Sequence, residues 1–174
     1  KYIKNKHKIP LIFPMAGSNQ NSDIIWTDAA KKICNEASKG EKVVLLCLGD
    51  PLIYSSSNEI YNKLLLMYED IIFEPGISSI SAASAVANFP LVQRGEQLLI
   101  AEASNDLDEM RKLINDLFLN KRNLCIMKLG NKWKAIKELL IQKKLLSKSF
   151  ICSRIGYIDQ RIINAENYEK DDLP

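Results

Sequence analysis

The sequence predicts an α/β fold in which helices alternate with the strands of a mostly parallel sheet. Apolar runs of strand length, such as residues 43–48, end abruptly in polar loops that contain glycine. Segments with helical spacing of apolar side chains lie between these runs along the chain. Parallel strands that are buried on both faces read as continuous apolar runs, and this alternation is typical of a parallel sheet. Ligands of such sheets bind just beyond the carboxyl ends of the strands.

In the first half of the chain, segments with helical spacing alternate with apolar runs of strand length. The first helix has an apolar stripe that includes Trp26, which we interpret as a packing residue, and Lys39-Gly40 supplies its C-terminal stop. The serine- and alanine-rich segment 78–87 has small side chains that let a helix approach a sheet or ligand closely. The predicted elements are a helix over residues 26–37, a strand over 42–48, a helix from Ser57 to about Met67, a strand over 70–73 and a helix over 78–87.

Residues 88–95 interrupt this periodicity, and the alternation then starts again. We therefore predict two domains, an N-terminal α/β domain over residues 1–92 and a C-terminal α/β domain over residues 96–174. The next helix begins near Leu107, with Asn105 or Asp106 as its expected N-cap. The other predicted elements of this half are strands over 97–101, 123–127, 149–153 and 160–163, and a helix over 133–140 that packs through Trp133.

Composition and charge exclude several classes of function. The 174 residues carry a formal net charge of only +3, and their acidic and basic side chains are interleaved without an aromatic-rich basic motif, so we expect no nucleic-acid partner. No apolar stretch approaches the roughly 20 residues that cross a bilayer, and the N-terminus does not read as a signal peptide. We expect a cytoplasmic protein without a membrane partner.

The cysteines and the single histidine do not predict a metal site. The four cysteines are scattered singly, without the paired spacing of a zinc or redox motif, and we interpret them as small buried residues in a reducing cytoplasm. His7 lies in a basic, poorly patterned segment, so we expect it on the surface. The cysteines are Cys34, Cys47, Cys125 and Cys152.

Two loops that follow predicted strands form the candidate ligand site. Gly49-Asp50-Pro51 follows the first apolar run, and Pro75-Gly76-Ile77-Ser78-Ser79 follows the second. The carboxyl ends of parallel strands lie at one edge of the sheet, so these loops are expected to meet there. The alternative is purely structural: a strand-ending turn in which Asp50 caps the next helix, and serines that cap the alanine-rich helix.

These motifs resemble those of the tetrapyrrole methylase family, with the greatest similarity to enzymes that methylate carbon 20 of precorrin-2 or cobalt-factor II. The resemblance covers residues 9–163, nearly the entire chain. The family has two α/β domains, with the methyl donor S-adenosylmethionine in the cleft between them. The matching segments are residues 49–55, 74–79, Ala83, Ala85, 90–91 and 126–130.

The resemblance also implies which residues contact the donor. After methyl transfer the donor becomes the product S-adenosylhomocysteine. The implied donor-site residues are Leu48, Gly49, Asp50, Pro51, Ile53, Ser78, Ser79, Met127 and Gly156. By default Met127 reads as a core residue of an apolar strand, so its donor role depends on the resemblance alone. The family opens with a strand and a glycine- and proline-rich loop that have no counterpart before Ile9, and it continues beyond residue 174. We therefore expect a chain truncated at both ends.

The implied chemistry needs little from the protein beyond alignment of donor and acceptor. A sulfonium is an activated methyl donor and a reduced tetrapyrrole offers a nucleophilic carbon, so no covalent nucleophile is expected. Tyr54 and Asp50 are the candidate acceptors of the proton that leaves carbon 20. Arg94, Lys128 and Arg154 are candidate anchors for substrate carboxylates, with ordinary solvated surface roles as the alternative.

Fold and motif leave other functions open. Within the family these are methylation of uroporphyrinogen III, methylation of ribosomal RNA and diphthamide synthesis. From a different class, a fragment of this fold would be a non-catalytic binding or structural module. Family members are commonly homodimers, and we expect one here. The sequence does not distinguish a metal-free substrate from a cobalt-loaded one.

Overall fold

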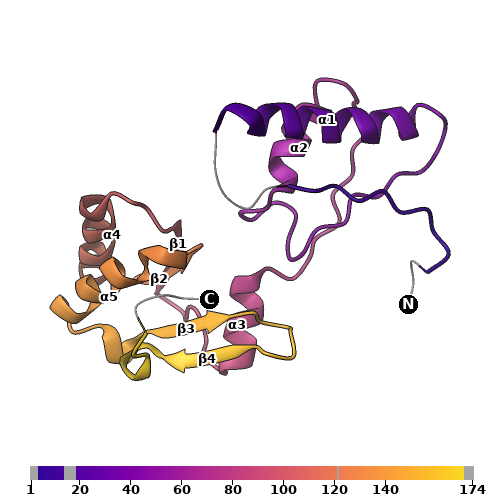
Figure 1. The fold of residues 1–174 in the computed structure, drawn as a ribbon. Helices are drawn as coiled ribbons and strands as arrows, with labels where there is room; N and C mark the ends of the chain where they lie inside the picture. Colours follow the sequence, from indigo (N-terminus) through magenta and orange to yellow (C-terminus); the bar gives the residue numbers. More distant parts are fainter. Residues whose placement is uncertain (1–3, 14–18, 121, 171–174) are drawn as a thin grey trace. The chain divides into compact units, whose positions relative to one another are not determined.

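The computed structural model describes residues 4–13, 19–120 and 122–170 of the chain (Figure 1). Both predicted domain ranges extend into residues outside this part. Contacts divide the chain into two compact units, Lys1–Ile77 and Ser78–Pro174. The division lies earlier than the predicted boundary at residues 92–96, because helix α3 (Ser79–Ala87) packs against strand β4 (Arg161–Asn164) of the second unit. Each unit is described by itself below.

The first unit is built on two helices that pack against each other, α1 (Asn19–Ala37) and α2 (Ser57–Leu64) (Figure 1). Both helices were predicted from their apolar stripes. Trp26 stacks on Phe13 with ring centroids 4.6 Å apart, which confirms it as a packing residue. The small core contains Ala29, Ala30, Ile60 and Leu64.

The predicted strands over residues 42–48 and 70–73 are wrong for this structure. Neither segment pairs with a strand in the described part of the chain. The apolar run is open to solvent, with Val44 67%, Leu46 66% and Leu48 85% exposed. An apolar run favours a buried strand, but a strand forms only where a neighbour completes its backbone hydrogen bonds.

The second unit begins with α3 and contains a strand-helix-strand unit. Strands β1 (Gln97–Glu102) and β2 (Arg122–Met127) are parallel, in a register that runs from Gln97 opposite Arg122 to Glu102 opposite Met127. Helix α4 (Leu107–Asn120) connects them and packs against β2 and α5 (Trp133–Gln142) (Figure 1). Parallel strands need such a crossover. The helix and both strands match their predictions.

The second sheet of this unit is antiparallel, unlike the mostly parallel sheet that the sequence predicts. Strands β3 (Phe150–Ser153) and β4 pair antiparallel, and short 3₁₀ turns flank α5 and both of these strands. The described strands therefore form one parallel and one antiparallel pair. The 3₁₀ turns are Gly130–Lys132, Leu146–Lys148 and Ala165–Asn167.

The core of the second unit lies between its helices and strands. Trp133 is 2% exposed and donates its indole N–H to the carbonyl of Lys170 over 3.1 Å, which confirms its packing role. The N-cap of α4 is Asp106, whose Oδ1 accepts from the amides of Asp108 at 2.9 Å and Glu109 at 3.3 Å. The buried core residues are Ala103, Met110, Ile114, Trp133, Ile136, Leu139, Leu140, Ile151, Ala165 and Tyr168.

The cysteines are less buried than the sequence predicts. Cys47 and Cys152 are exposed, whereas Cys34 and Cys125 are half-buried, and all four thiols are free. Cys47 lies in the uncovered run of the first unit, which explains its exposure. Burial, and secondarily the neighbouring Cys152, raise the pKa of Cys125. Partial burial of the thiol raises the pKa of Cys152, although the residue as a whole is exposed. Within the described residues, no cluster of three His, Cys, Asp or Glu side chains has the arrangement of a metal site.

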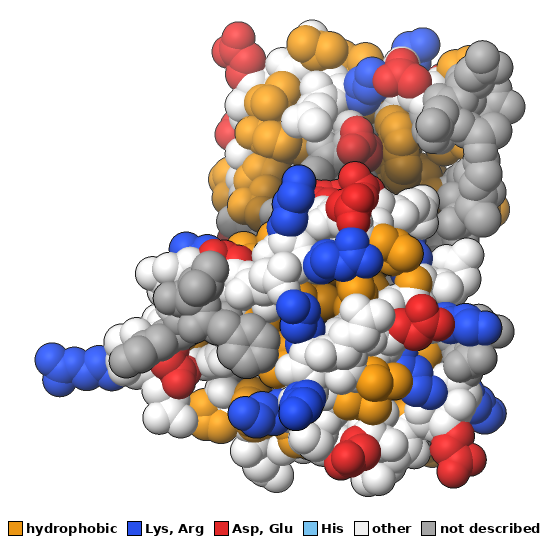
Figure 2. Space-filling view, turned by 90° about the vertical axis from the view of Figure 1, so that its left-hand side faces the viewer, with side chains coloured by type: hydrophobic (Ala, Val, Ile, Leu, Met, Phe, Trp, Pro, Cys, Tyr) orange, Lys and Arg blue, Asp and Glu red, His pale blue; other side chains and the backbone are white. Residues whose placement is uncertain are grey.

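The surface mixes charged and apolar side chains. Figure 2 shows a face on which Lys and Arg side chains are interspersed with Asp and Glu, and on which apolar side chains also reach the surface. His7 is exposed, as predicted. In the described part of the chain, no helix has the length and apolar character needed to span a membrane.

Candidate functional site

The two loops singled out by sequence meet at Gly49 and Gly76, which both lie in the first unit. A Cβ atom added to Gly76 would lie 2.2 Å from the carbonyl oxygen of Gly49, so the two backbones are in direct contact. The amide of Gly76 also donates to Oδ2 of Asp50 over 3.3 Å. We expected these loops to meet because each would follow a strand of one parallel sheet. They do meet, although neither follows a paired strand.

The first loop is ordered by bonds between its side chains and its backbone. Oδ1 of Asp50 accepts from the amide of Leu52 over 2.9 Å. The buried hydroxyl of Ser57 donates to the carbonyl of Pro51 over 2.7 Å and lies at the same distance from the hydroxyl of Ser55. Asp50 therefore does not cap α2, whose N-cap Ser56 has no side-chain cap bond. Asp50 instead joins its own loop to the loop at Gly76.

Backbone conformation explains the residue type at Gly49. Its φ is +85°, in the left-handed region that glycine tolerates and other residues avoid. Tyr54 in the same loop also has a positive φ, 51°, which is rare for an aromatic residue. Leu48, Ile53 and Tyr54 are 85%, 41% and 38% exposed, so the loop presents apolar and aromatic side chains to solvent. The loop therefore exposes a glycine backbone beside apolar side chains.

Ser78 and Ser79 open the second unit. Ser78 is the N-cap of α3, and its hydroxyl accepts from the amide of Ser81 over 3.3 Å. Ser78 is 8% exposed, whereas Ser79 is exposed in the first turn of the helix. The structural interpretation of Ser78 is therefore confirmed, and its predicted contact with a methyl donor stays a prediction.

Met127 and Lys128 lie at the carboxyl end of β2. Met127 is half-buried, and its carbonyl accepts from the amide of Ala103 over 2.9 Å. Lys128 follows it with a φ of 54°, and its Nζ lies 3.5 Å from the carboxylate of Glu102. This end of the parallel pair thus carries a basic and an acidic side chain together.

Arg154 and Gly156 lie in the turn between β3 and β4. Nε of Arg154 pairs with Asp159 over 2.6 Å, and its guanidinium carbon lies 4.9 Å from the centroid of the Tyr157 ring. The hydrogen bond to Asp159 raises the pKa of Arg154 and lowers the pKa of the Asp159 carboxyl. Gly156 has a φ of +87°, and its amide donates to the Gln160 side chain over 3.1 Å. Binding of a substrate carboxylate by Arg154 requires competition with Asp159.

Arg94 differs from the other two predicted anchors. Its side chain is exposed between α3 and β1 and forms no ion pair with any residue that the structure describes. A guanidinium without a carboxylate partner is better able to bind a carboxylate of a ligand. Arg94 is thus the most available of the three.

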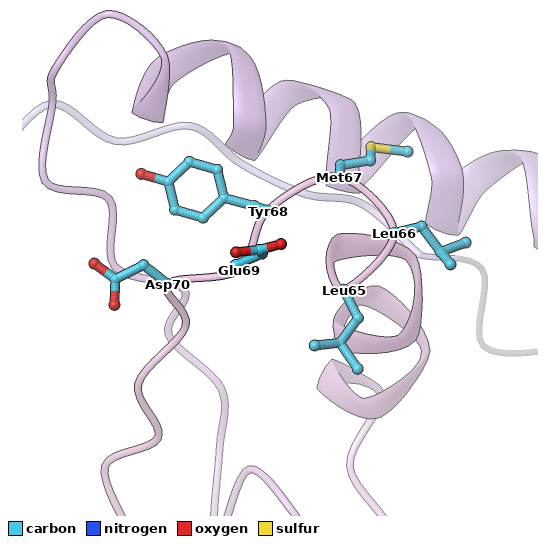
Figure 3. Close-up of a pocket in the computed structure, with 6 residues that line it drawn as sticks. All are labelled: Leu65, Leu66, Met67, Tyr68, Glu69 and Asp70. Atoms are coloured by element: carbon cyan, nitrogen blue, oxygen red, sulfur yellow. The ribbon is translucent and has the colours of Figure 1, made fainter.

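Two hollows in the described part of the chain are lined by residues other than the predicted site residues. One hollow of about 500 Å³ is lined by six consecutive residues after α2, Leu65 to Asp70. Their side chains fan out from a single turn instead of converging on one point (Figure 3). Another, of about 270 Å³, lies near the end of α5. Neither brings together groups that would act on a common ligand.

Three residues of the loop contact were missed by sequence reasoning. Gly76 was noted as part of a motif but given no role, while Leu52 and Ser57 were not considered as site residues. Gly76 contacts Gly49, the amide of Leu52 binds Asp50, and Ser57 holds the carbonyl of Pro51. The available signal was the pair of glycines, one in each loop, since a glycine in a loop often marks a close backbone approach.

Comparisons with known proteins place these motifs in context. The cobalamin biosynthesis protein CobIJ of Mycobacterium tuberculosis (strain ATCC 25618 / H37Rv) is 29% identical over 149 residues, which are 86% of this chain and 28% of that protein. A probable cobalt-precorrin-2 C(20)-methyltransferase of Methanocaldococcus jannaschii is 32% identical over 108 residues, which are 62% of this chain and 46% of the relative. The chain thus spans less than half the length of either relative.

A solved structure shares the fold. The X-ray structure of a cobalamin biosynthetic enzyme, the cobalt precorrin-4 methyltransferase CbiF, matches with a TM-score of 0.65 at 16% identity, over 87% of this chain and 64% of that one. This likeness confirms the α/β tetrapyrrole methylase fold. A sequence profile of the family described as Tetrapyrrole (Corrin/Porphyrin) Methylases matches residues 1–170. The chain therefore belongs to the tetrapyrrole methylase family.

Proposed function

We propose that this chain takes part in cobalamin biosynthesis by transferring a methyl group from S-adenosylmethionine to carbon 20 of precorrin-2 or cobalt-factor II. The observation that carries the proposal is the contact between the loops at Gly49 and Gly76, which presents ordered backbone groups at the motif position of the family's donor site. The name of the Methanocaldococcus relative supports the position of the methylated carbon.

The donor is held mainly by the first loop. The exposed backbone at Gly49 and the exposed side chains of Leu48 and Ile53 receive its adenosine. Asp50 and Pro51 are the other two residues of this loop that we propose for the donor site. From the family resemblance we also propose donor contacts for Ser78, Ser79, Met127 and Gly156. The donor supplies an electrophilic methyl group, and the role of these residues is to hold it in line with the nucleophilic carbon.

The proton that leaves carbon 20 passes to a side chain of the first loop or to water. Both oxygens of Asp50 accept backbone amides, which makes this carboxylate a poorer acceptor than water, and Tyr54 would take the proton only as a phenolate. Arg94 is the principal anchor for substrate carboxylates, and Lys128 and Arg154 are secondary because each lies beside an acidic partner. We further propose a cytoplasmic homodimer, as is common in the family.

The test is a calorimetric titration of the 174-residue chain with S-adenosylhomocysteine. We expect micromolar binding, about 8 kcal/mol. Gly49→Leu should abolish it, because a branched side chain at a φ of +85° distorts the loop that binds the donor. Gly40→Leu is the matched control, since Gly40 has a φ of +83° and no atom within 4 Å of the position that a Cβ would take.

The outcomes separate the candidate functions. Binding that Gly49→Leu removes and Gly40→Leu preserves supports the donor site and justifies methylation assays with precorrin-2 and cobalt-factor II. Binding without methylation of either, but with methylation of uroporphyrinogen III, would replace the proposed substrate. Absence of binding would contradict the proposal and favour a non-catalytic module of the same fold.

A further inference from the structure

Asp50 connects the two loops of the first unit through both of its carboxylate oxygens. Oδ1 accepts from the amide of Leu52, within its own loop, and Oδ2 accepts from the amide of Gly76, 26 positions further along the chain. Hydrogen bonds to a charged acceptor are stronger than those between neutral groups. One side chain therefore fixes the conformation of the first loop and the position of the second against it.

The contact between the backbones of Gly49 and Gly76 leaves no room for a side chain on Gly76. A Cβ atom on Gly76 would lie 2.2 Å from the oxygen and 3.0 Å from the carbon of the Gly49 carbonyl, and 3.4 Å from Cα of Asp50. Gly76 does not have a positive φ, so glycine is required here by space and not by backbone conformation. Asp50 and Gly76 together set the separation of the two backbones.

We infer that Asp50 is a positioning residue of the donor site, where it clamps the loop at Gly76 against the loop at Gly49, and that it is not the acceptor of the proton. The donor-binding part of this inference rests on the proposed function, whereas the clamp itself does not. A carboxylate whose two oxygens both accept amides is held in one orientation, and neither oxygen is unengaged. These properties suit a residue that holds two loops together better than a residue that must accept a proton during the reaction.

The first test measures the clamp without any ligand. Amide hydrogen exchange at Leu52 and Gly76 is followed by NMR in the unmodified 174-residue chain and in its Asp50→Ala and Asp50→Asn variants. Asp50→Ala removes both acceptors, so exchange should accelerate at both amides, by about tenfold. Asp50→Asn keeps one acceptor oxygen and should accelerate only one amide strongly. Glu74→Gln is the control, because Glu74 is an exposed carboxylate directly before the second loop.

The second test measures the consequence for the donor site. Affinity for S-adenosylhomocysteine should fall about tenfold or more in Asp50→Ala and less in Asp50→Asn. Gly76→Ala should also weaken it, because the added methyl group must push the loops apart while leaving the bond within the first loop intact. Gly40→Ala is the control, and circular dichroism verifies that each variant is folded.

The results separate the clamp from the proposed function. Faster exchange in Asp50→Ala in a chain that does not bind S-adenosylhomocysteine would support the clamp and contradict the donor site. Unchanged exchange at Gly76 would overturn the clamp. The inference would also be overturned if Asp50→Asn lowered kcat while exchange and affinity stayed unchanged, because that pattern belongs to a proton acceptor.

Discussion

The two units of this chain differ in where their apolar residues lie. In the second unit, helices and strands enclose a core that includes Met110, Ile114 and Trp133, each at most 2% exposed. In the first unit, two helices share a small core, while the apolar run through Leu46 and Leu48 stays open to solvent. The same type of sequence, a short apolar run, is thus a covered strand in one unit and an uncovered segment in the other.

The difference teaches that a strand depends on its partners as much as on its own residues. Residues 97–102 and 122–127 pair directly with one another, and a single helix connects them along the chain. Each strand therefore finds its partner close by in the sequence. The run at residues 42–48 lacks such a neighbour in the described part of its unit. Its polar end nevertheless forms the ordered loop at Asp50, because that loop is held by its own side-chain bonds.

The largest expected effect tests the core of the second unit. Trp133→Ala should lower the free energy of unfolding by about 3–5 kcal/mol, because it removes a buried aromatic side chain and leaves the Lys170 carbonyl without its donor. Trp26→Ala is the comparison in the first unit, where the ring is only half-buried and stacks on Phe13. Urea unfolding followed by circular dichroism measures both variants. Equal losses would remove the contrast between the units.

The parts predicted from sequence are those whose signals are local. The apolar stripes of α4 and α5 repeat at helical spacing, and Asp106 lies just before α4 as a capping residue should. The two parallel strands were predicted as short segments that alternate with these helices. The run at residues 42–48 has the same pattern, but its pairing depends on residues distant in sequence, which a single sequence does not reveal.

The candidate site was predicted in outline but not in its connections. The motifs at Gly49 and Gly76 indicated that two loops share a site, and the structure brings these loops together. The bond from Gly76 to Asp50 depends on the detailed path of the first loop, which includes a left-handed Tyr54 that residue preference disfavours. Residue types therefore identified the loops, but the role of Asp50 required coordinates.

A smaller effect is expected in the uncovered run. Leu46→Ala should change the free energy of unfolding by no more than about 0.5 kcal/mol, because Leu46 is 66% exposed. The same substitution at Leu139, which is 4% exposed, should cost about 2–5 kcal/mol and serves as the matched control. A loss of about 2 kcal/mol or more at Leu46 would indicate that the run is covered in solution, as in a buried strand.

The smallest effect concerns the turn between β3 and β4, which an exposed ion pair organises. The hydrogen bond from Arg154 lowers the pKa of Asp159, so the folded pKa lies below the unfolded one. The resulting stabilisation is present above the unfolded carboxyl pKa and is lost as the pH falls through the folded pKa. NMR titration of the Asp159 carboxyl should give a midpoint below the ordinary value, and Arg154→Gln should return it toward that value. A midpoint that Arg154→Gln leaves unchanged would show that the pair does not persist in solution. Arg154 would then be as available to a substrate carboxylate as Arg94 is, and the order of the anchors proposed above would no longer hold.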